Sequence, residues 1–304
     1  MAFSVLLVDY CSIETTLKYI DLCNEKMKSK DPIQFFITDV SPEAKGWAYL
    51  KDNLTEVSNR PIKSKTLYEY EYHGKSIYCI PAYENLGYAR GNNLAAAASI
   101  VLFPDNHLLV SNNDILFEQD CDLDEVDSYF TDLDYAVAGP DIIQHGQHMN
   151  PMYQNPPSYY MFLIYLNTVL PKKLPVPYNN TRYAFSGCFW FFNVKHFAWV
   201  QGFDEGTFMY FEEQIMEERM HSIGAKFHYL RDMKVIHDHS TKRQTCKAAV
   251  KYINTIHRSC NHYVKYYLKP NPIMYGLSNL CFYVLMVPFV IERWIRDLIY
   301  KVKN

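Results

Sequence analysis

The chain has 304 residues, of which 49% are hydrophobic and 21% charged, and its formal net charge at pH 7 is −3. This composition is typical of a folded globular protein and excludes the disordered and fibrous classes. The small negative charge excludes the broad basic surface with which proteins neutralise nucleic-acid phosphates, so no polynucleotide partner is expected.

The first unit predicted along the chain is a strand, a helix and a second strand. Residues 3–9 and 33–39 are short apolar runs that each end in an aspartate, and residues 13–27 between them have a helical pattern. Further strands are predicted at 76–81, 107–111, 135–139 and 184–192, with a helix at 91–102. Strands that alternate with helices indicate an α/β fold with a largely parallel, helix-covered sheet.

Two regions of this predicted fold are candidates for ligand contact. Ligands bind open α/β sheets beyond the carboxyl ends of the strands, where Asp9, Asp39 and the segment 112–114 fall. Residues 144–182 form a long stretch rich in Pro, Asn and Tyr, which is typical of a functional lid.

The C-terminal region is predicted to be helical. Residues 244–268 have apolar positions near helical spacing, and the prolines at 270 and 272 then interrupt the chain. Residues 273–291 carry no formal charge but contain Gly, Ser, Asn and Pro, which predicts a poor transmembrane helix. Residues 292–303 mix apolar, aromatic and basic side chains as interfacial helices do. We expect attachment to a membrane surface, with packing on the catalytic domain or on a second subunit as the alternative.

The location of the protein is predicted from two further features. The eight cysteines are scattered without a CxxC pair, so reduced thiols are the simplest interpretation. The first nine residues lack the basic stretch of a secretory signal, which predicts a cytoplasmic protein, peripheral on the inner face of the plasma membrane.

Ordered motifs carry a family resemblance over about residues 3–245. They are Asn85-Leu86-Gly87-Tyr88-Ala89-Arg90-Gly91-Asn92-Asn93, Leu109-Val110-Ser111-Asn112-Asn113-Asp114, Ser186-Gly187-Cys188-Phe189, Gly202-Phe203-Asp204-Glu205, Phe208-Met209-Tyr210-Phe211-Glu212-Glu213 and Val235-Ile236-His237-Asp238-His239. With these motifs the chain resembles the family-2 glycosyltransferases, especially the rhamnosyltransferase-like and galactosyltransferase-like enzymes of bacterial surface polysaccharide assembly. The resemblance implies a GT-A fold, which is Rossmann-like with a mixed central sheet flanked by helices. It also implies a catalytic domain over 1–243, with a nucleotide-sugar half at 1–115 and an acceptor half at 116–243, before a helical extension at 244–304.

The reaction implied by the resemblance needs a charge to neutralise a departing diphosphate and a base to deprotonate an acceptor hydroxyl. Oxygen ligands suit Mg²⁺ or Mn²⁺, and an added imidazole favours Mn²⁺. The resemblance places Asp114, His237 and His239 on the metal. The alternatives are an Asx-turn or helix cap for Asp114 and a packed or solvated side chain for His239.

Two neighbouring carboxylates are candidates for the base. The resemblance gives this role to Glu213, with Glu212 as the fallback, whereas a charge at a helix N-terminus is the alternative for both. The residues predicted to bind the nucleotide sugar are Asp9, Asp39, Asn85, Gly87, Arg90, Asn93 and Asn113. An unpaired surface side chain is the alternative for Arg90, and a simple turn glycine for Gly87.

The predicted function is therefore inverting, metal-dependent transfer from a UDP- or dTDP-sugar to a surface-glycan acceptor, which is lipid-linked in many enzymes of the resembling family. One competing hypothesis is a non-catalytic, membrane-associated scaffold that retains the nucleotide pocket. The other is a sugar nucleotidyltransferase, which ranks lower because no Gly-rich phosphate loop follows Asp9.

Overall fold

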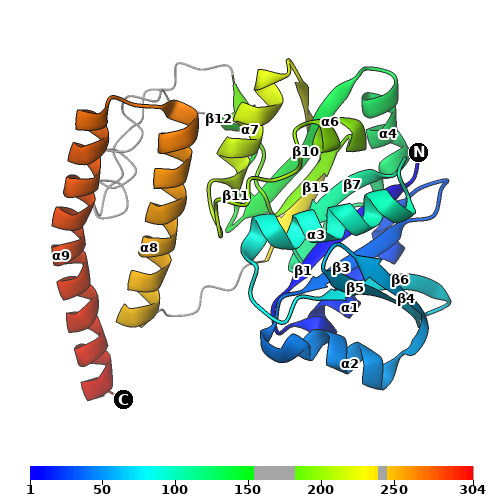
Figure 1. Ribbon diagram of the computed structural model, residues 1–304, viewed down its shortest axis with the longest axis horizontal. Coiled ribbons are helices and arrows are strands. Elements are labelled where there is room, and N and C mark those ends of the chain that lie inside the picture. Colours follow the sequence, from blue (N-terminus) through cyan, green and yellow to red (C-terminus); the bar gives the residue numbers. More distant parts are fainter. Residues whose placement is uncertain (154–181, 239–244, 304) are drawn as a thin grey trace.

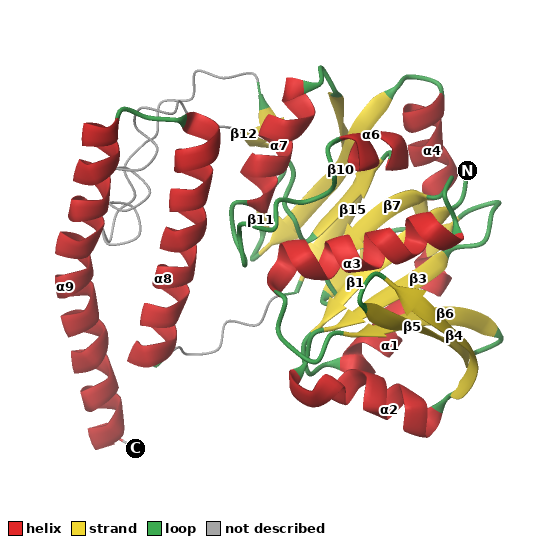
Figure 2. Cartoon of the chain, viewed as in Figure 1, coloured by secondary structure: helices red, strands yellow, loops and turns green. Residues whose placement is uncertain are grey.

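The computed structural model describes residues 1–153, 182–238 and 245–303. In this part of the chain, one eleven-stranded sheet forms the centre of the molecule (Figure 2). Its strands in spatial order are β4 (Thr55–Ile62), β5 (Lys65–Tyr72), β6 (Lys75–Pro81), β3 (Gln34–Asp39), β1 (Phe3–Asp9), β7 (His107–Ser111), β14 (Phe189–Phe192), β10 (Tyr135–Gln144), β15 (Lys226–His237) and β8 (Ile115–Phe117), with β11 (Gln147–His148) paired to β10.

The sheet has a parallel centre and antiparallel additions. β6, β3, β1 and β7 are mutually parallel, and β10 is parallel to β15. β14 runs antiparallel between β7 and β10, and β8 closes the far edge antiparallel to β15. The predicted α/β fold class with a mixed central sheet is therefore confirmed.

Helices cover both faces of the sheet (Figure 1). They are α1 (Ile13–Lys26), α2 (Lys45–Asn53), α3 (Gly87–Leu102), α4 (Leu123–Thr131), α6 (Val194–Trp199) and α7 (Glu212–Ser222). Leu17 and Ile20 of α1 pack with Val126 of α4 in the core of one face, and Ala95 of α3 packs with Met216 of α7 in the core of the other. Burial of these apolar stripes against the sheet is the main stabilising contribution.

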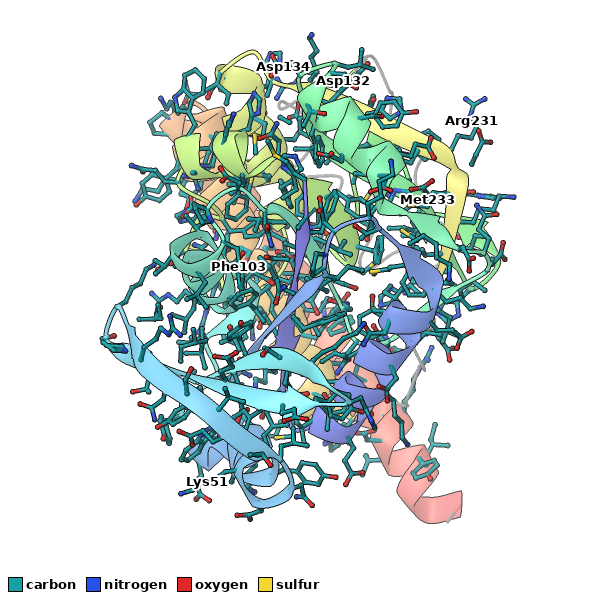
Figure 3. All side chains as sticks on the ribbon, turned by 90° about the vertical axis from the view of Figure 1, so that its right-hand side faces the viewer. Lys51, Phe103, Asp132, Asp134, Arg231 and Met233 are labelled. Carbon is teal, nitrogen blue, oxygen red and sulfur yellow. The ribbon has the colours of Figure 1, made fainter. Side chains whose placement is uncertain are left out.

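Short elements complete the domain. β2 (Met27–Lys28) pairs with β9 (Cys121–Asp122), β12 (Met152–Tyr153) pairs with β13 (Tyr183–Ala184), and a 3₁₀ turn spans Pro42–Ala44. Phe103, which is labelled in Figure 3, follows the end of α3. Its ring packs edge-on against Phe36 and Tyr78 of the sheet.

Some predicted elements have the bounds that the structure shows, and others differ. The strands predicted at 3–9 and 107–111 have those bounds, whereas α3 begins four residues before the predicted helix. The strand predicted at 184–192 is divided into β13 and β14, because the segment from Ser186 to Cys188 forms a turn. Most of the predicted lid, residues 154–181, lies outside the described residues.

The C-terminal region is a helical hairpin beside the domain (Figure 1). α8 (Cys246–Tyr263) continues into a π-turn (Val264–Leu268), the chain reverses at Lys269, and α9 (Pro272–Lys303) runs back along α8. Phe211 and Ile215 of the domain form a third apolar cluster with Ile253 and Cys260 of α8 and Phe282 of α9. The predicted break at Pro270 and Pro272 agrees with the structure.

The apolar segment predicted as a poor transmembrane helix belongs to one continuous helix that includes Pro288. Its stretch Tyr275–Tyr300 has a mean hydropathy of 1.4, and 12% of that window is buried. By length and composition alone, this stretch is long and apolar enough to cross a membrane. Core helices of soluble proteins and signal sequences meet the same two criteria.

Candidate active site

Sheet register brings Asp114 and His237 together from distant parts of the chain. β8 begins directly after Asp114 and pairs antiparallel with the end of β15, so that Ile115 lies opposite His237. The Asp238 backbone N–H donates to the Asp114 carbonyl oxygen at 3.0 Å. As a result, Asp114 Oδ1 lies 3.2 Å from His237 Nε2.

The turn that separates β13 from β14 lies against this pair. Burial alone would lower the pKa of His237, but hydrogen bonds with Asp114 and Cys188 outweigh it and raise that pKa to about 10. The Cys188 carbonyl also accepts a hydrogen bond from the Asn112 backbone N–H at 2.8 Å. The turn therefore sits beside both the end of β7 and the end of β15.

The same turn contacts Glu213. The Gly187 backbone N–H donates to Glu213 Oε1 at 3.1 Å, and the Tyr88 hydroxyl donates to the Gly187 carbonyl at 2.6 Å. Trp190 Nε1 in turn donates to the Tyr88 hydroxyl at 3.0 Å. Asp114, His237 and Glu213, which are far apart in sequence, therefore surround one three-residue turn.

Glu212 and Glu213 start α7 in a water-poor setting. Burial raises the pKa of both carboxyl groups, and repulsion from Glu213 raises that of Glu212 further. Among the described residues, Glu212 Oε2 is buried without a hydrogen-bond partner, whereas Glu213 accepts the Gly187 N–H, which stabilises its charged form. Both carboxyl groups are therefore harder to ionise than exposed ones, and Glu212 more so than Glu213.

An unusual backbone precedes the two glutamates. Tyr210 and Phe211 both have left-handed conformations, with φ of 72° and 69°. Gly87 allows this segment to approach α3 closely, because a Cβ at position 87 would lie 2.1 Å from the Phe208 carbonyl oxygen, to which Tyr88 N donates at 2.8 Å. Such strain persists only where neighbouring structure holds it.

The Asp114–His237 pair fits a divalent cation. Metal–ligand distances of about 2.1 Å place adjacent corners of an octahedron about 3 Å apart, close to the separation observed between the two ligand atoms. Among the described residues, no group of three or more His, Cys, Asp or Glu side chains is arranged to hold a metal ion. His239 lies outside the described residues. Two protein ligands suit a cation that completes its shell with diphosphate oxygens and water.

Asp9 and Asp39 lie at the predicted strand ends, but their side chains face inward. Asp9 is fully buried and accepts hydrogen bonds from Thr16 Oγ1 at 2.6 Å and from the Ser12 hydroxyl at 2.9 Å. Burial raises the pKa of Asp9, with these hydrogen bonds acting in the opposite direction. Asn113 joins this network by donating to Thr16 Oγ1 at 2.8 Å. Asp9 therefore orders the start of α1.

Asp39 plays the same part at the start of α2. It accepts the Trp47 backbone N–H at 2.7 Å and the Ser41 hydroxyl at 2.6 Å. Between the starts of α1 and α2 lies a pocket of about 380 Å³, lined by Cys11, Ser12, Ile13, Glu14, Thr15, Lys45, Gly46 and Tyr49. This pocket lies where open α/β sheets bind ligands. Direct contact of the two aspartates with a nucleotide stays a prediction.

The predicted residues of the 85–93 motif hold the backbone of this region. Asn85 Oδ1 accepts the Gly87 N–H at 3.0 Å, and the Asn93 side chain exchanges hydrogen bonds with the backbone of Phe203. Arg90 is exposed and lies 3.9 Å from Glu205, so its nearest charged partner is a surface carboxylate. Their contact with a nucleotide sugar likewise stays a prediction.

Sequence reasoning missed three parts of this site. Tyr88 and Cys188 stood in recognised motifs without an assigned role, and the pocket beside Lys45 arises only when α1 and α2 are folded. A further dyad, with His148 Nδ1 2.9 Å from the buried Asp141 carboxylate, lies at the β10–β11 hairpin. Its signal was an aspartate in an otherwise apolar strand.

Comparison with known proteins agrees with this architecture. No family model and no curated protein matches the chain. The chain is similar to a solved structure of the mannosyltransferase PcManGT from Pyrobaculum calidifontis in complex with GDP-Man and Mn²⁺. The TM-score is 0.52 at 10% sequence identity, and the match covers 99% of this chain and 75% of that chain. The chain thus shares a Rossmann-like α/β fold with that structure.

Proposed function

We propose that this protein is a metal-dependent glycosyltransferase that moves a sugar from a nucleotide diphosphate to an acceptor hydroxyl. The observation that carries the proposal is the gathering of Asp114, His237 and Glu213 around the turn at Gly187. The supporting context is a fold shared with a mannosyltransferase that was solved with a nucleotide sugar and Mn²⁺. Asp114, His237 and Glu213 also stand in the motifs that resemble those of family-2 rhamnosyltransferase-like and galactosyltransferase-like enzymes.

The chemistry follows from the charges of the site. Asp114 and His237 would hold the cation, which when bound offsets the charge of a departing diphosphate. Glu213 takes the proton of the acceptor hydroxyl, which then attacks the anomeric carbon opposite the leaving group and inverts its configuration. Burial and repulsion raise the pKa of Glu212 further than burial raises that of Glu213, so Glu213 is the member of the pair to which we assign the role of base.

The donor is proposed to be a UDP- or dTDP-sugar, by the resemblance at Asp39. Because both oxygens of Asp39 already accept hydrogen bonds, we place the base in the adjacent pocket beside Lys45 and Tyr49. A surface glycan, lipid-linked as in the resembling family, is the proposed acceptor.

The test is a donor screen with the full-length chain. UDP-, dTDP- and GDP-sugars are incubated with Mn²⁺ and with glycan or lipid-linked acceptors, and the released nucleoside diphosphate and the glycosylated product are measured. The proposal expects Mn²⁺-dependent release that needs a higher Mn²⁺ concentration in the Asp114→Asn variant. Tight nucleotide binding without turnover of any donor would favour the scaffold, and pyrophosphate release from a nucleoside triphosphate and a sugar phosphate would favour the nucleotidyltransferase.

We also propose that α9 rests on a lipid surface. Its exposed apolar side chains are Ile273, Leu277, Leu280, Tyr283, Val284, Val287, Ile291, Trp294, Ile295, Leu298, Ile299 and Tyr300. Residues 280–291 are apolar on all sides of the helix, which is typical of a buried or lipid-exposed helix rather than of a narrow dimer seam. A lipid surface at this place would bring the active site close to a lipid-linked acceptor.

The hairpin geometry favours a helix that lies in the membrane plane. α8 is fastened along α9, with the Cys246 backbone N–H donating to Asp297 at 2.6 Å and Asn261 donating to Asn279 at 2.8 Å. Lys247, Lys251 and Arg258 of α8 are exposed along this length. An α9 that spanned the membrane would carry these cations into hydrocarbon, which is costly.

Flotation with anionic vesicles tests this arrangement. The chain is expected to float with the vesicles, and Val284→Asp should abolish flotation, whereas Leu133→Asp on a distant exposed loop should not. A stable dimer in the absence of lipid, dissociated by Val284→Asp, would contradict the lipid proposal and identify a second copy as the partner of α9.

A further inference from the structure

The segment that leads into the two glutamates is fastened to the C-terminal helices. Asp204 Oδ2 accepts a hydrogen bond from the Tyr267 hydroxyl at 2.6 Å and lies 2.8 Å from His262 Nε2. Burial alone would raise the pKa of Asp204, but the hydrogen bonds from Tyr267 and His262 outweigh it and lower that pKa. Asp204 therefore stays ionised and gives the π-turn and the end of α8 a charged anchor on the domain.

A second attachment lies closer to the glutamates. The Ser259 hydroxyl donates to the Met209 carbonyl at 2.6 Å, and the Tyr263 ring packs against Phe211 with ring centroids 5.7 Å apart. The His262 ring lies directly on Gly206, where an added Cβ would come within 2.0 Å of the ring. α8 and the π-turn thus contact both ends of the segment 204–211 and its middle.

This segment needs external restraint because of its backbone. Tyr210 and Phe211 are consecutive left-handed residues that carry side chains, a conformation that is sterically unfavourable for any residue with a Cβ. On the opposite side, the hydrogen bond from Tyr88 N to the Phe208 carbonyl holds the same segment to α3. The strained pair is therefore clamped between α3 and α8, directly before the helix that carries Glu212 and Glu213.

From this clamp we infer that Ser259, His262 and Tyr267 are positioning residues, which hold the 204–211 segment so that Glu213 meets the acceptor hydroxyl. The inference rests on the proposed function and assigns the C-terminal hairpin a part in catalysis besides attachment. A base displaced by as little as 1 Å loses much of its rate advantage, whereas the pocket beside Lys45, which Ser259, His262 and Tyr267 do not line, is unaffected.

Two pairs of matched variants test the inference in the full-length chain. Ser259→Ala removes the contact with Met209, and Thr255→Ala removes a hydroxyl from the same helix that bonds only within α8, to the Lys251 carbonyl. Tyr267→Phe removes the bond to Asp204, and Tyr266→Phe removes a hydroxyl that makes no hydrogen bond among the described residues.

The expected result is a split in kinetics. Ser259→Ala should lower kcat roughly fivefold, the equivalent of one ordinary hydrogen bond, and Tyr267→Phe about tenfold or more, because its partner is charged. KM for the donor should not change, and both controls should match the parent. Hydrogen exchange over 204–213 should become faster in Ser259→Ala and Tyr267→Phe alone.

Each other outcome overturns the inference. Faster exchange with an unchanged kcat would leave α8 a merely structural support, and unchanged exchange would show that the contacts do not restrain the segment. If the parent chain turns over no donor, the proposed function is overturned and this inference with it. If the parent is active but the test variants have the same kinetics as their controls, only this inference is overturned.

Discussion

Replacement of Glu213 by Gln is the sharpest single perturbation of the proposed chemistry. Glutamine keeps the size of the side chain and can still accept the Gly187 N–H that now lies 3.1 Å from Glu213 Oε1. It cannot take a proton from the acceptor. General-base catalysis contributes typically 10²- to 10⁴-fold, so kcat should fall by about that factor, or about 3–5 kcal/mol in the barrier.

The assay compares Glu213→Gln with Glu212→Gln under saturating donor and Mn²⁺. Binding of the nucleoside diphosphate should match the parent in both variants, because neither side chain faces the pocket beside Lys45. The loss of kcat should be greater for Glu213→Gln, since burial and repulsion from Glu213 make Glu212 the weaker acid of the two carboxyls. A fully active Glu213→Gln, or a greater loss in Glu212→Gln, would refute the assignment of the base.

Three further outcomes follow from particular contacts. Burial raises the pKa of Glu213 above its ordinary value of 4.5, so ionisation of this carboxyl lowers the stability of the fold at a pH above the raised pKa and has no such effect below pH 4.5. Glu213→Gln should therefore raise Tm at pH 7. Thermal unfolding at lower pH should show that the difference in Tm between variant and parent vanishes. Gly87→Ala should destabilise the fold more than Gly74→Ala does in denaturant unfolding, because both glycines have φ above 70° but only the former would place a Cβ 2.1 Å from the Phe208 carbonyl; equal losses would show that φ alone decides. Asp114→Asn should raise the Mn²⁺ concentration needed for half-maximal turnover by about tenfold or more, and a titration identical to that of the parent would exclude Asp114 as a ligand.

The fold was largely predictable from local patterns. Residues 3–9 and 107–111 are continuous apolar runs, which buried parallel strands require, and the structure places both in the middle of the sheet. A strand ending near His237 was expected, but its start at Lys226 was not, because residues 226–237 mix charged and apolar side chains as a strand near the sheet edge does. α4 and α6 were also missed, since each is a short helix whose caps come from single residues, Asp122 and Asn193.

The position of the candidate site residues in space was harder to predict than their position in the sequence motifs. The motifs named Asp114, His237 and Glu213, but their meeting depends on the antiparallel register of β8 with β15 and on the turn at Gly187, which no spacing along the chain encodes. Asp9 and Asp39 lie at the predicted strand ends, yet each carboxylate orders the start of the following helix. A serine two or three residues after each aspartate was the available signal for such local hydrogen bonding.

Anomalous diffraction at the manganese edge, from crystals grown with Mn²⁺ and a nucleoside diphosphate, tests the central claim most directly. The account predicts one strong peak within about 2.3 Å of an Asp114 carboxylate oxygen and of His237 Nε2, with the diphosphate on its open side. A peak that contacts neither side chain, or a nucleotide bound away from this crevice, would contradict it.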